Sequence, residues 1–285
     1  MKDLFETIFH ISMLIFVSGS MISLGLSLSF EQIIAPFKKT PMIIRALIAN
    51  FIMVPLFAYA ILVLMASVFP VSEGVRSGII LLALSGGAPF IPKVVEAAKA
   101  NISDGVGMML LLMMVTIVFM PVTIPFVFSN ISVSSLDIIQ PILYSMIIPL
   151  LFALIFKARF SDIAMRIQPY AIKLTNLSIL ILFVSVIVLY SEVIRNNASV
   201  LPVILLFFLG STLIGYLAGG HISNARILFS IGTGLRNPPI CVLVASQSFP
   251  NEPMAAIVPL LVILIGLSIL FPLAVTVRKR KKNNT

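Results

Sequence analysis

Nearly the whole chain consists of apolar runs that are each long enough to cross a lipid bilayer. A spanning helix needs about 20 mostly apolar residues. Nine such runs follow one another with short gaps, at 5–29, 42–69, 76–100, 105–129, 136–157, 170–193, 200–219, 225–249 and 254–277. They lack the alternating pattern of a transmembrane β-barrel. The sequence therefore predicts an all-α polytopic membrane protein with about nine transmembrane helices.

The composition supports this fold class and excludes several others. Only 10% of the residues are charged and 60% are hydrophobic, whereas a soluble domain has about 25% charged residues. A soluble enzyme, a disordered protein and a nucleic-acid binder are excluded on these grounds. The gaps leave no room for a soluble domain. We therefore expect one transmembrane domain over 1–285, with halves of about 1–130 and 131–277 and a basic tail at 278–285.

The basic residues predict how the chain is oriented. With nine spans, 14 Lys and Arg residues fall on one side of the membrane and 3 on the other. Basic residues concentrate on the cytoplasmic side of membrane proteins. We therefore expect an N-terminus outside, a cytoplasmic C-terminus, and an integral protein of a bacterial-type plasma (inner) membrane.

Two of the predicted spans, 76–100 and 225–249, contain glycines, prolines and a basic residue near their middle. The helix-breaking residues are Gly86, Gly87, Pro89 and Pro92 in the first span and Gly232, Gly234, Pro238 and Pro239 in the second. Proline lacks an N–H and clashes with the preceding turn, and glycine loosens a helix, so we expect both spans to be interrupted. Irregular backbone at membrane depth is tolerated only where protein or a water-filled cavity satisfies it.

The two interrupted spans also resemble each other weakly. When Gly87 is placed over Gly234, Gly, Pro and Ala recur at three positions. In a chain of nine spans the third runs inward and the eighth outward. This placement predicts inverted repeats whose broken helices cross near the midplane. Paired interruptions of this kind point to the binding site of a transporter.

The basic residue of each interrupted span is a candidate substrate ligand. The free N–H groups of a half-helix bind anions, and the free C=O groups bind cations. A charge at bilayer depth is costly and is usually paired, hydrated or functional. Lys93 and Arg236 would lie at or beside the crossing. The alternative for Lys93 is that it snorkels to the interface or pairs with Glu96.

Several neutral and acidic residues are further candidates, each with a structural alternative. Glu96 carries a proton or cation, or is a solvated member of the ladder Lys93, Glu96 and Lys99. Asn50 reaches the crossing or bonds to a neighbouring helix. The candidate substrate-binding set is Lys93, Arg236, Asn237, Pro92, Thr233 and Asn50, and the candidates for ion or proton coupling are Glu96, Thr116 and Asn50. Thr116 otherwise bonds to its own helix, and Asn237 otherwise caps a half-helix. Thr175, Asn176 and Ser178 either line an inner vestibule or start a helix.

These segments resemble the bile acid:sodium symporter family in order and spacing over nearly the whole chain. The motifs are the stretch 18–28, Phe37-Lys38-Lys39-Thr40-Pro41, Ala49-Asn50-Phe51 through Pro55, the Gly86-Gly87 break ending at Lys99-Ala100-Asn101, and Gly234-Leu235-Arg236-Asn237. The resemblance implies a core domain that holds two crossed broken helices, and a panel domain of spans 1, 5 and 6 that moves against it. It also implies transport of organic anions, such as bile acids or small carboxylates, by alternating access and sodium symport.

The chain departs from this family's pattern where the family binds sodium. Members carry Ser-Asn after the first break, where this chain has Phe90-Ile91-Pro92-Lys93, and Glu and Gln around the second, where it has Gly232 and Arg236. Asn50 stands where Gln is usual, and of the next span's hydroxyls mainly Thr116 is left. We therefore predict that Lys93 and Arg236 take the place of two sodium ions and hold the anion. No cofactor is expected, and the missing ligands argue against bound sodium.

Two other function classes remain as alternatives. One is a membrane sensor or regulator that keeps the fold without transporting. The other is an intramembrane enzyme, which would need convergent His, Cys, Asp or Glu residues at helix depth. The single cysteine, Cys241, and the histidines His10 and His221 are far apart in the sequence and predict no metal or catalytic site. The expected partners are an organic anion and the lipid bilayer, and we expect a monomer or a homodimer.

Overall fold

The structure is a computed structural model that describes residues 2–28, 40–68, 70–128, 140, 143–196 and 200–283. Throughout these ranges the secondary structure is helical, without a strand. The elements are α1 (Lys2–Ser27), α3 (Thr40–Ile48), the π-helix η2 (Ala49–Met53), α4 (Val54–Ala66), α5 (Glu73–Leu84), α6 (Ile91–Ala97), α7 (Ile102–Val127), the π-helix η3 (Leu143–Ile147), α9 (Ile148–Arg159), α10 (Ser161–Asn196), α11 (Val200–Ala218), α12 (Ser223–Gly234), α13 (Pro238–Ser248) and α14 (Pro253–Asn283).

Seven of the predicted spans are confirmed as helical segments long and apolar enough to cross a membrane, one of which comprises both α12 and α13. They are Leu4–Ser27, Thr40–Ala66, Ile102–Val127, Ser161–Glu192, Val200–Ala218, Ser223–Ser248 and Pro253–Thr276. The predicted third span, 76–100, is divided between α5 and α6, neither of which has that length. The predicted fifth span, 136–157, begins in residues outside the described part of the chain, as do Lys38 and Lys39 of the first basic connection.

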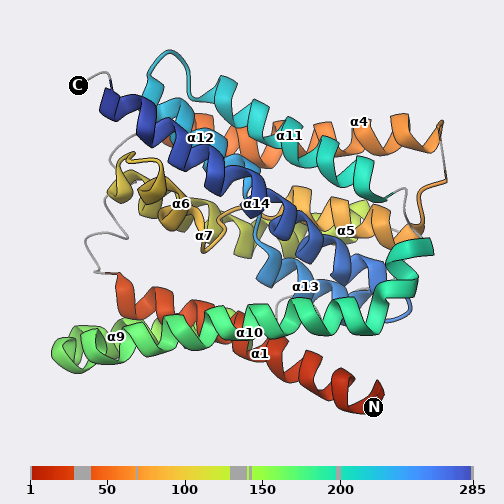
Figure 1. Cartoon of the computed structure of the whole chain (residues 1–285), viewed down its shortest axis with the longest axis horizontal. Coiled ribbons are helices and arrows are strands. Elements are labelled where there is room, and N and C mark those ends of the chain that lie inside the picture. Colours follow the sequence, from red (N-terminus) through yellow and green to blue (C-terminus); the bar gives the residue numbers. More distant parts are fainter. Residues whose placement is uncertain are drawn as a thin grey trace.

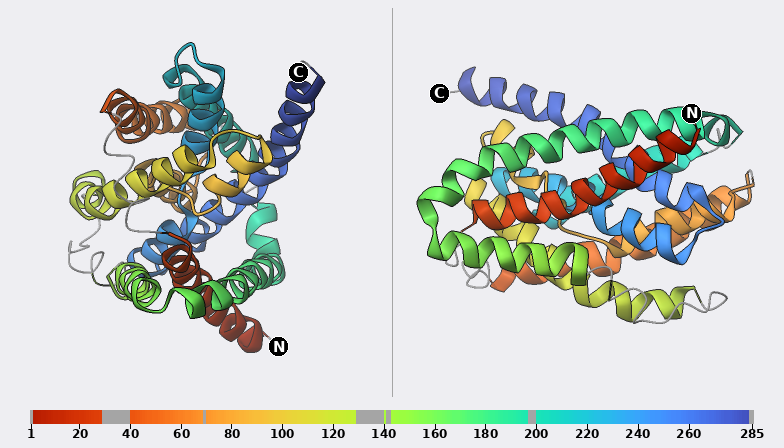
Figure 2. Two further views of the ribbon diagram at one scale, coloured as in Figure 1. Left: turned by 90° about the vertical axis from the view of Figure 1, so that its left-hand side faces the viewer. Right: turned by 90° about the horizontal axis from the view of Figure 1, so that it is seen from below.

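The helices form two layers (Figure 1). α1 packs along α9 and α10, and these three helices form the smaller layer, which runs along one side of the molecule (Figure 2). In the larger layer α11 packs on α4 and α12, while α14 packs on α5 and α13. The two layers touch where α1 meets α13 and α10 meets α14. The N-terminal end of α1 and the C-terminal end of α14 lie at opposite ends of the long axis (Figure 1).

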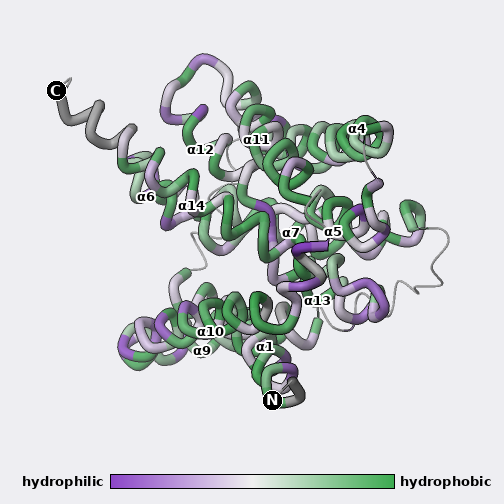
Figure 3. Tube along the Cα trace, turned by 45° about the vertical axis from the view of Figure 1, so that its right-hand side comes forward, coloured by the Kyte–Doolittle hydropathy of each residue, from purple (hydrophilic) through white to green (hydrophobic). Residues whose placement is uncertain are grey.

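Apolar side chains cover the outside of the helices as well as their inside. Hydrophobic residues predominate along the helices (Figure 3). Phe126, Ile155 and Leu217 are among many large apolar residues that are exposed on the surface. Exposing such an apolar surface to water is unfavourable, whereas exposing it to the hydrocarbon core of a bilayer is not. The structure therefore agrees with an integral membrane protein.

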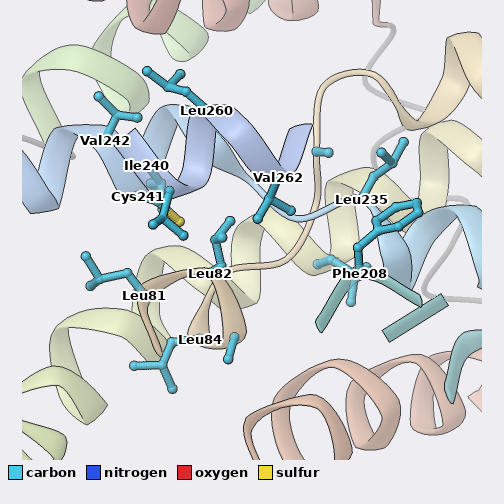
Figure 4. Packing of buried hydrophobic residues seen from close by; sticks show 14 of the residues in the cluster. Leu81, Leu82, Leu84, Phe208, Leu235, Ile240, Cys241, Val242, Leu260 and Val262 are labelled. Atoms are coloured by element: carbon cyan, nitrogen blue, oxygen red, sulfur yellow. The ribbon is translucent and has the colours of Figure 1, made fainter. Parts of the chain in front are cut away.

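Part of the fully buried core lies where the two interrupted spans meet. Every residue of α13 from Pro238 to Ala245 is buried. Leu81 and Leu82 of α5 pack near Cys241 of α13, beside residues of α14 (Figure 4). The two interrupted spans are thus enclosed by protein on all sides at this point, which is the condition for irregular backbone at membrane depth.

Candidate functional site

Both predicted interruptions are present as breaks in the helices. The first lies between α5 and α6, over residues 85–90, and contains Gly86, Gly87 and Pro89. Pro92 lies in the first turn of α6. α5 packs on α13 and α6 packs on α12, so the two breaks lie side by side.

The second break is shorter and begins later than expected from its glycines. Residues 235–237 separate α12 from α13, which Pro238 and Pro239 open. Gly232 lies within the last turn of α12 rather than in the break, and Gly234 is the last residue of that helix. Gly232 has a packing role, since a Cβ there would meet the end of the Met108 side chain at 2.6 Å.

Gly87 and Thr116 determine the backbone conformation of the first break. Gly87 has φ +81°, and a Cβ at this position would lie 2.6 Å from the carbonyl oxygen of Met109 on α7. Only glycine suits this conformation and this close approach. The Thr116 hydroxyl accepts a hydrogen bond from Gly86 N (2.7 Å) and donates one to Gly86 O (3.1 Å). Thr116 therefore bonds to the break rather than to its own helix.

We expect Thr116→Val to lower the free energy of unfolding by about 1–3 kcal/mol, because the buried Gly86 N–H loses its acceptor. Thr123→Val is the matched control on the same helix, since the Thr123 hydroxyl bonds within its own helix to Phe119 O (2.6 Å). Thermal unfolding in detergent measures both. Equal losses in the two variants would contradict a special role of Thr116.

Arg236, in the second break, is the largest charged group in the core and is only 2% exposed. Nε donates to Leu82 O (2.9 Å), and Nη2 donates to Ala83 O (2.8 Å). Both carbonyls belong to the last turn of α5, at the negative end of the helix dipole. Leu82 O also accepts a hydrogen bond from Ser85 N (3.1 Å). Nη1 donates to Asn50 Oδ1 (2.6 Å), and Nη2 donates to Asn50 O (3.3 Å). All four acceptors are neutral oxygens.

The carbonyl of Asn50 is available because η2 is a π-helix. Val54 N donates to Ala49 O, one residue further back than in an α-helix. The next residue, Pro55, has no N–H to donate. Asn50 O therefore lacks a helical donor and accepts from Arg236 instead. The residue types alone did not predict the π-helix η2. Its only local signal is the proline five residues after Asn50.

Three buried side chains, Asn50, Thr233 and Arg236, form one hydrogen-bonded network. We call these three residues and the buried Asn237 beside them in the second break the buried junction. Asn50 Nδ2 donates to Thr233 Oγ1 (3.1 Å) and to Ala46 O (2.9 Å). Asn237 Nδ2 lies 3.3 Å from the carbonyl oxygens of both residues 86 and 87. Asn237 thus contacts the first break and does not cap α13. The buried junction ties η2 and α12 to both breaks.

A cleft of about 390 Å³ lies between the two layers, away from the buried junction. α6 contributes Pro92, Lys93 and Glu96 to it. Lys93 and Glu96 are exposed, whereas Val94 and Val95 between them are buried. Its polar residues on the smaller layer are Ser20, Ser23 and Ser27 of α1 and Gln168, Thr175 and Asn176 of α10. The structure therefore separates the two candidate cations: Lys93 faces the cleft, and Arg236 is enclosed.

The serines of the cleft were not singled out from the sequence. Ser20, Ser23 and Ser27 follow one another at intervals of three and four residues, which places them on one face of a helix. Gln168 Nε2 donates to Ser27 Oγ (2.8 Å), and Ser23 Oγ lies 3.4 Å from Thr175 Oγ1. The helical spacing of small polar residues is the sequence signal from which these contacts between α1 and α10 could have been predicted.

The family model described as "Sodium Bile acid symporter family" matches residues 13–197. The chain belongs to this family. The matched range contains α5, α6, α7 and the parts of α1 and α10 that line the cleft. A search of curated proteins finds no match to the chain. Members of the sodium bile acid symporter family are membrane transporters rather than enzymes, so the chain is a transporter-family protein. Among the described residues, no group of three His, Cys, Asp or Glu side chains could hold a metal ion.

Proposed function

We propose that this protein is a secondary transporter of an organic anion, and that it works without sodium coupling. The observation that carries the proposal is the enclosure of the Arg236 guanidinium by oxygens next to both breaks. Unwound carbonyls and the C-terminal ends of half-helices are the groups with which broken-helix transporters hold sodium. Arg236 places a permanent positive charge among such groups. A mobile cation at the same position would be repelled by it.

Lys93 has a different role in this proposal from the one expected from the sequence. Its exposed position in the cleft suits a ligand of the substrate's acid group better than a replacement for a buried ion. A charge-assisted bond to a carboxylate is stronger than a neutral hydrogen bond. The cleft walls are mainly apolar, with hydroxyl and amide groups on the smaller layer. We therefore infer an anion with one acid group, an apolar body and a few polar substituents.

The position of the cleft between the two layers supports transport by alternating access. Movement of the α1, α9 and α10 layer against the other helices would open the cleft first to one side of the membrane and then to the other. Inverted repeats around the two breaks would make the two openings equivalent. Glu96 borders the same cleft and is the candidate proton carrier if transport is linked to protons.

The proposal is tested by uptake of a panel of organic anions into proteoliposomes. We expect uptake to change less than about twofold when external sodium is replaced by potassium or choline at zero membrane potential. Protein-free liposomes set the background, and Glu96→Gln with an imposed pH gradient tests for proton linkage. Uptake that rises steeply with a sodium gradient would contradict the sodium-independent mechanism. Ligand-induced thermal stabilisation without any flux would instead favour a non-transporting sensor.

A further inference from the structure

Two arginines lie together at the connection between α11 and α12, far from the cleft. Arg226 Nε donates to Gly220 O, and its Nη1 donates to Tyr216 Oη (3.1 Å). The guanidinium carbon of Arg226 lies 4.9 Å from the centre of the Tyr216 ring. Arg45 reaches the same connection from α3, since a Cβ on Gly220 would lie 3.1 Å from Arg45 Nη1. We call Arg45 and Arg226 the arginine pair.

The charge of the arginine pair is not neutralised within the described part of the chain. Arg45 is exposed and makes no hydrogen bond or ion pair there. Arg226 uses Nε and Nη1 for neutral oxygens, and its Nη2 has no partner in that part of the chain. Two guanidinium groups with unused donors at one connection make an anion site, because guanidinium forks match phosphate oxygens.

An apolar groove runs along each side of α11 from the arginine pair. One groove, of about 270 Å³, lies between α3, η2 and α11 and has Arg45 in its lining. The other, of about 360 Å³, lies between α11, α12 and α14 and includes Tyr216, the partner of Arg226. Leu217 and Leu213 on the grooves are more than half exposed. α11 and α4 lie on the opposite side of the molecule from the α1 and α10 layer (Figure 1).

We infer that the arginine pair binds the phosphate of an anionic phospholipid whose two acyl chains lie in the grooves on the two sides of α11. Basic pockets between transmembrane helices near a membrane surface recognise anionic headgroups. The predicted orientation places the arginine pair on the cytoplasmic side, where anionic lipids are concentrated. The combination of two guanidinium groups that have unused donors with two flanking apolar grooves fits a lipid better than a free anion, which would leave the grooves uncovered.

The test is a titration of the purified full-length protein in detergent with phosphatidylglycerol, followed by native mass spectrometry. Phosphatidylcholine and inorganic phosphate are titrated in parallel. We expect phosphatidylglycerol to bind about fivefold more weakly to Arg45→Gln, and about 25-fold more weakly to Arg45→Gln combined with Arg226→Gln. The matched control combines Arg159→Gln with Arg166→Gln, two exposed arginines of α9 and α10. This control should bind the lipid within about twofold of the unmodified protein.

Three results would overturn the inference. The first is unchanged phosphatidylglycerol binding in the Arg45 and Arg226 variants. The second is equal binding of phosphatidylcholine, which would remove the role of headgroup charge. The third is competition by millimolar inorganic phosphate, which would identify a free-anion site instead. Arg45→Gln decides the matter alone if Arg226→Gln unfolds, because Arg45 forms no hydrogen bond within the described residues.

Discussion

Arg236→Ala is expected to abolish transport and to lower the free energy of unfolding by about 3 kcal/mol or more. The substitution removes the donors of four buried hydrogen bonds. Ala83 O and the two oxygens of Asn50 lose the donor that Arg236 supplies, whereas Leu82 O keeps its bonds from Ser85. It also leaves a cavity where the two breaks meet. Thermal unfolding in detergent and uptake into proteoliposomes measure the two losses separately.

Three further variants make this prediction specific. Arg166→Ala removes an exposed arginine of α10 and should leave both quantities unchanged. Arg236→Lys keeps the charge but lacks the planar fork, so we expect only part of the stability to return. Added guanidinium ion, and to a lesser extent sodium, should stabilise Arg236→Ala because each can occupy the vacated position. An Arg236→Ala protein with ordinary stability and transport would refute the role of Arg236 as a resident cation.

Lys93→Gln is expected to lower the transport efficiency for the anion, measured as kcat/KM, by about 100-fold. The loss corresponds to about 2.7 kcal/mol, the range of a hydrogen bond to a charged group. The free energy of unfolding should hardly change, because the Lys93 side chain is exposed in the cleft. Initial uptake rates over a range of anion concentrations give kcat/KM for each variant.

Lys99→Gln is the matched control for Lys93→Gln. Lys99 follows α6, is exposed and is not among the residues that line the cleft. Its loss removes the same charge from the same part of the chain and should leave uptake unchanged. If the two variants transport equally well, Lys93 is not the ligand of the anion and the cleft assignment fails with it.

Most of the fold could be predicted from the sequence, because a bilayer permits few structures for the chain that crosses it. Runs of about 20 apolar residues leave few alternatives to spanning helices, and seven were found where expected. The glycines and prolines at 86–89 and 234–239 placed both interruptions close to their observed positions. The end of α12 was less predictable. Gly232 allows close packing against Met108 and remains in the helix instead of breaking it.

The site was harder to predict, because Lys93 and Arg236 look alike in the sequence and differ only in three dimensions. Arg236 lies in a break that is surrounded by protein, whereas Lys93 lies on a short helix whose rotation decides its direction. Val94 and Val95 turn inward, and Lys93 is left facing the cleft. The free carbonyl of Asn50 likewise depends on the shift of hydrogen bonds in η2, which residue types alone do not reveal.

The covalent attachment of the Arg236 guanidinium has an energetic consequence for any transport cycle. A dissociating cation brings the energy of its concentration gradient to the substrate, but a side chain has no gradient and leaves on neither side. Unless a proton or a counter-anion is moved as well, the anion then moves only down its own electrochemical potential. An inside-negative potential of 100 mV favours exit of a monovalent anion by about 2.3 kcal/mol. We therefore expect such a carrier to act as an overflow route or an exchanger, and not as a pump that accumulates its substrate.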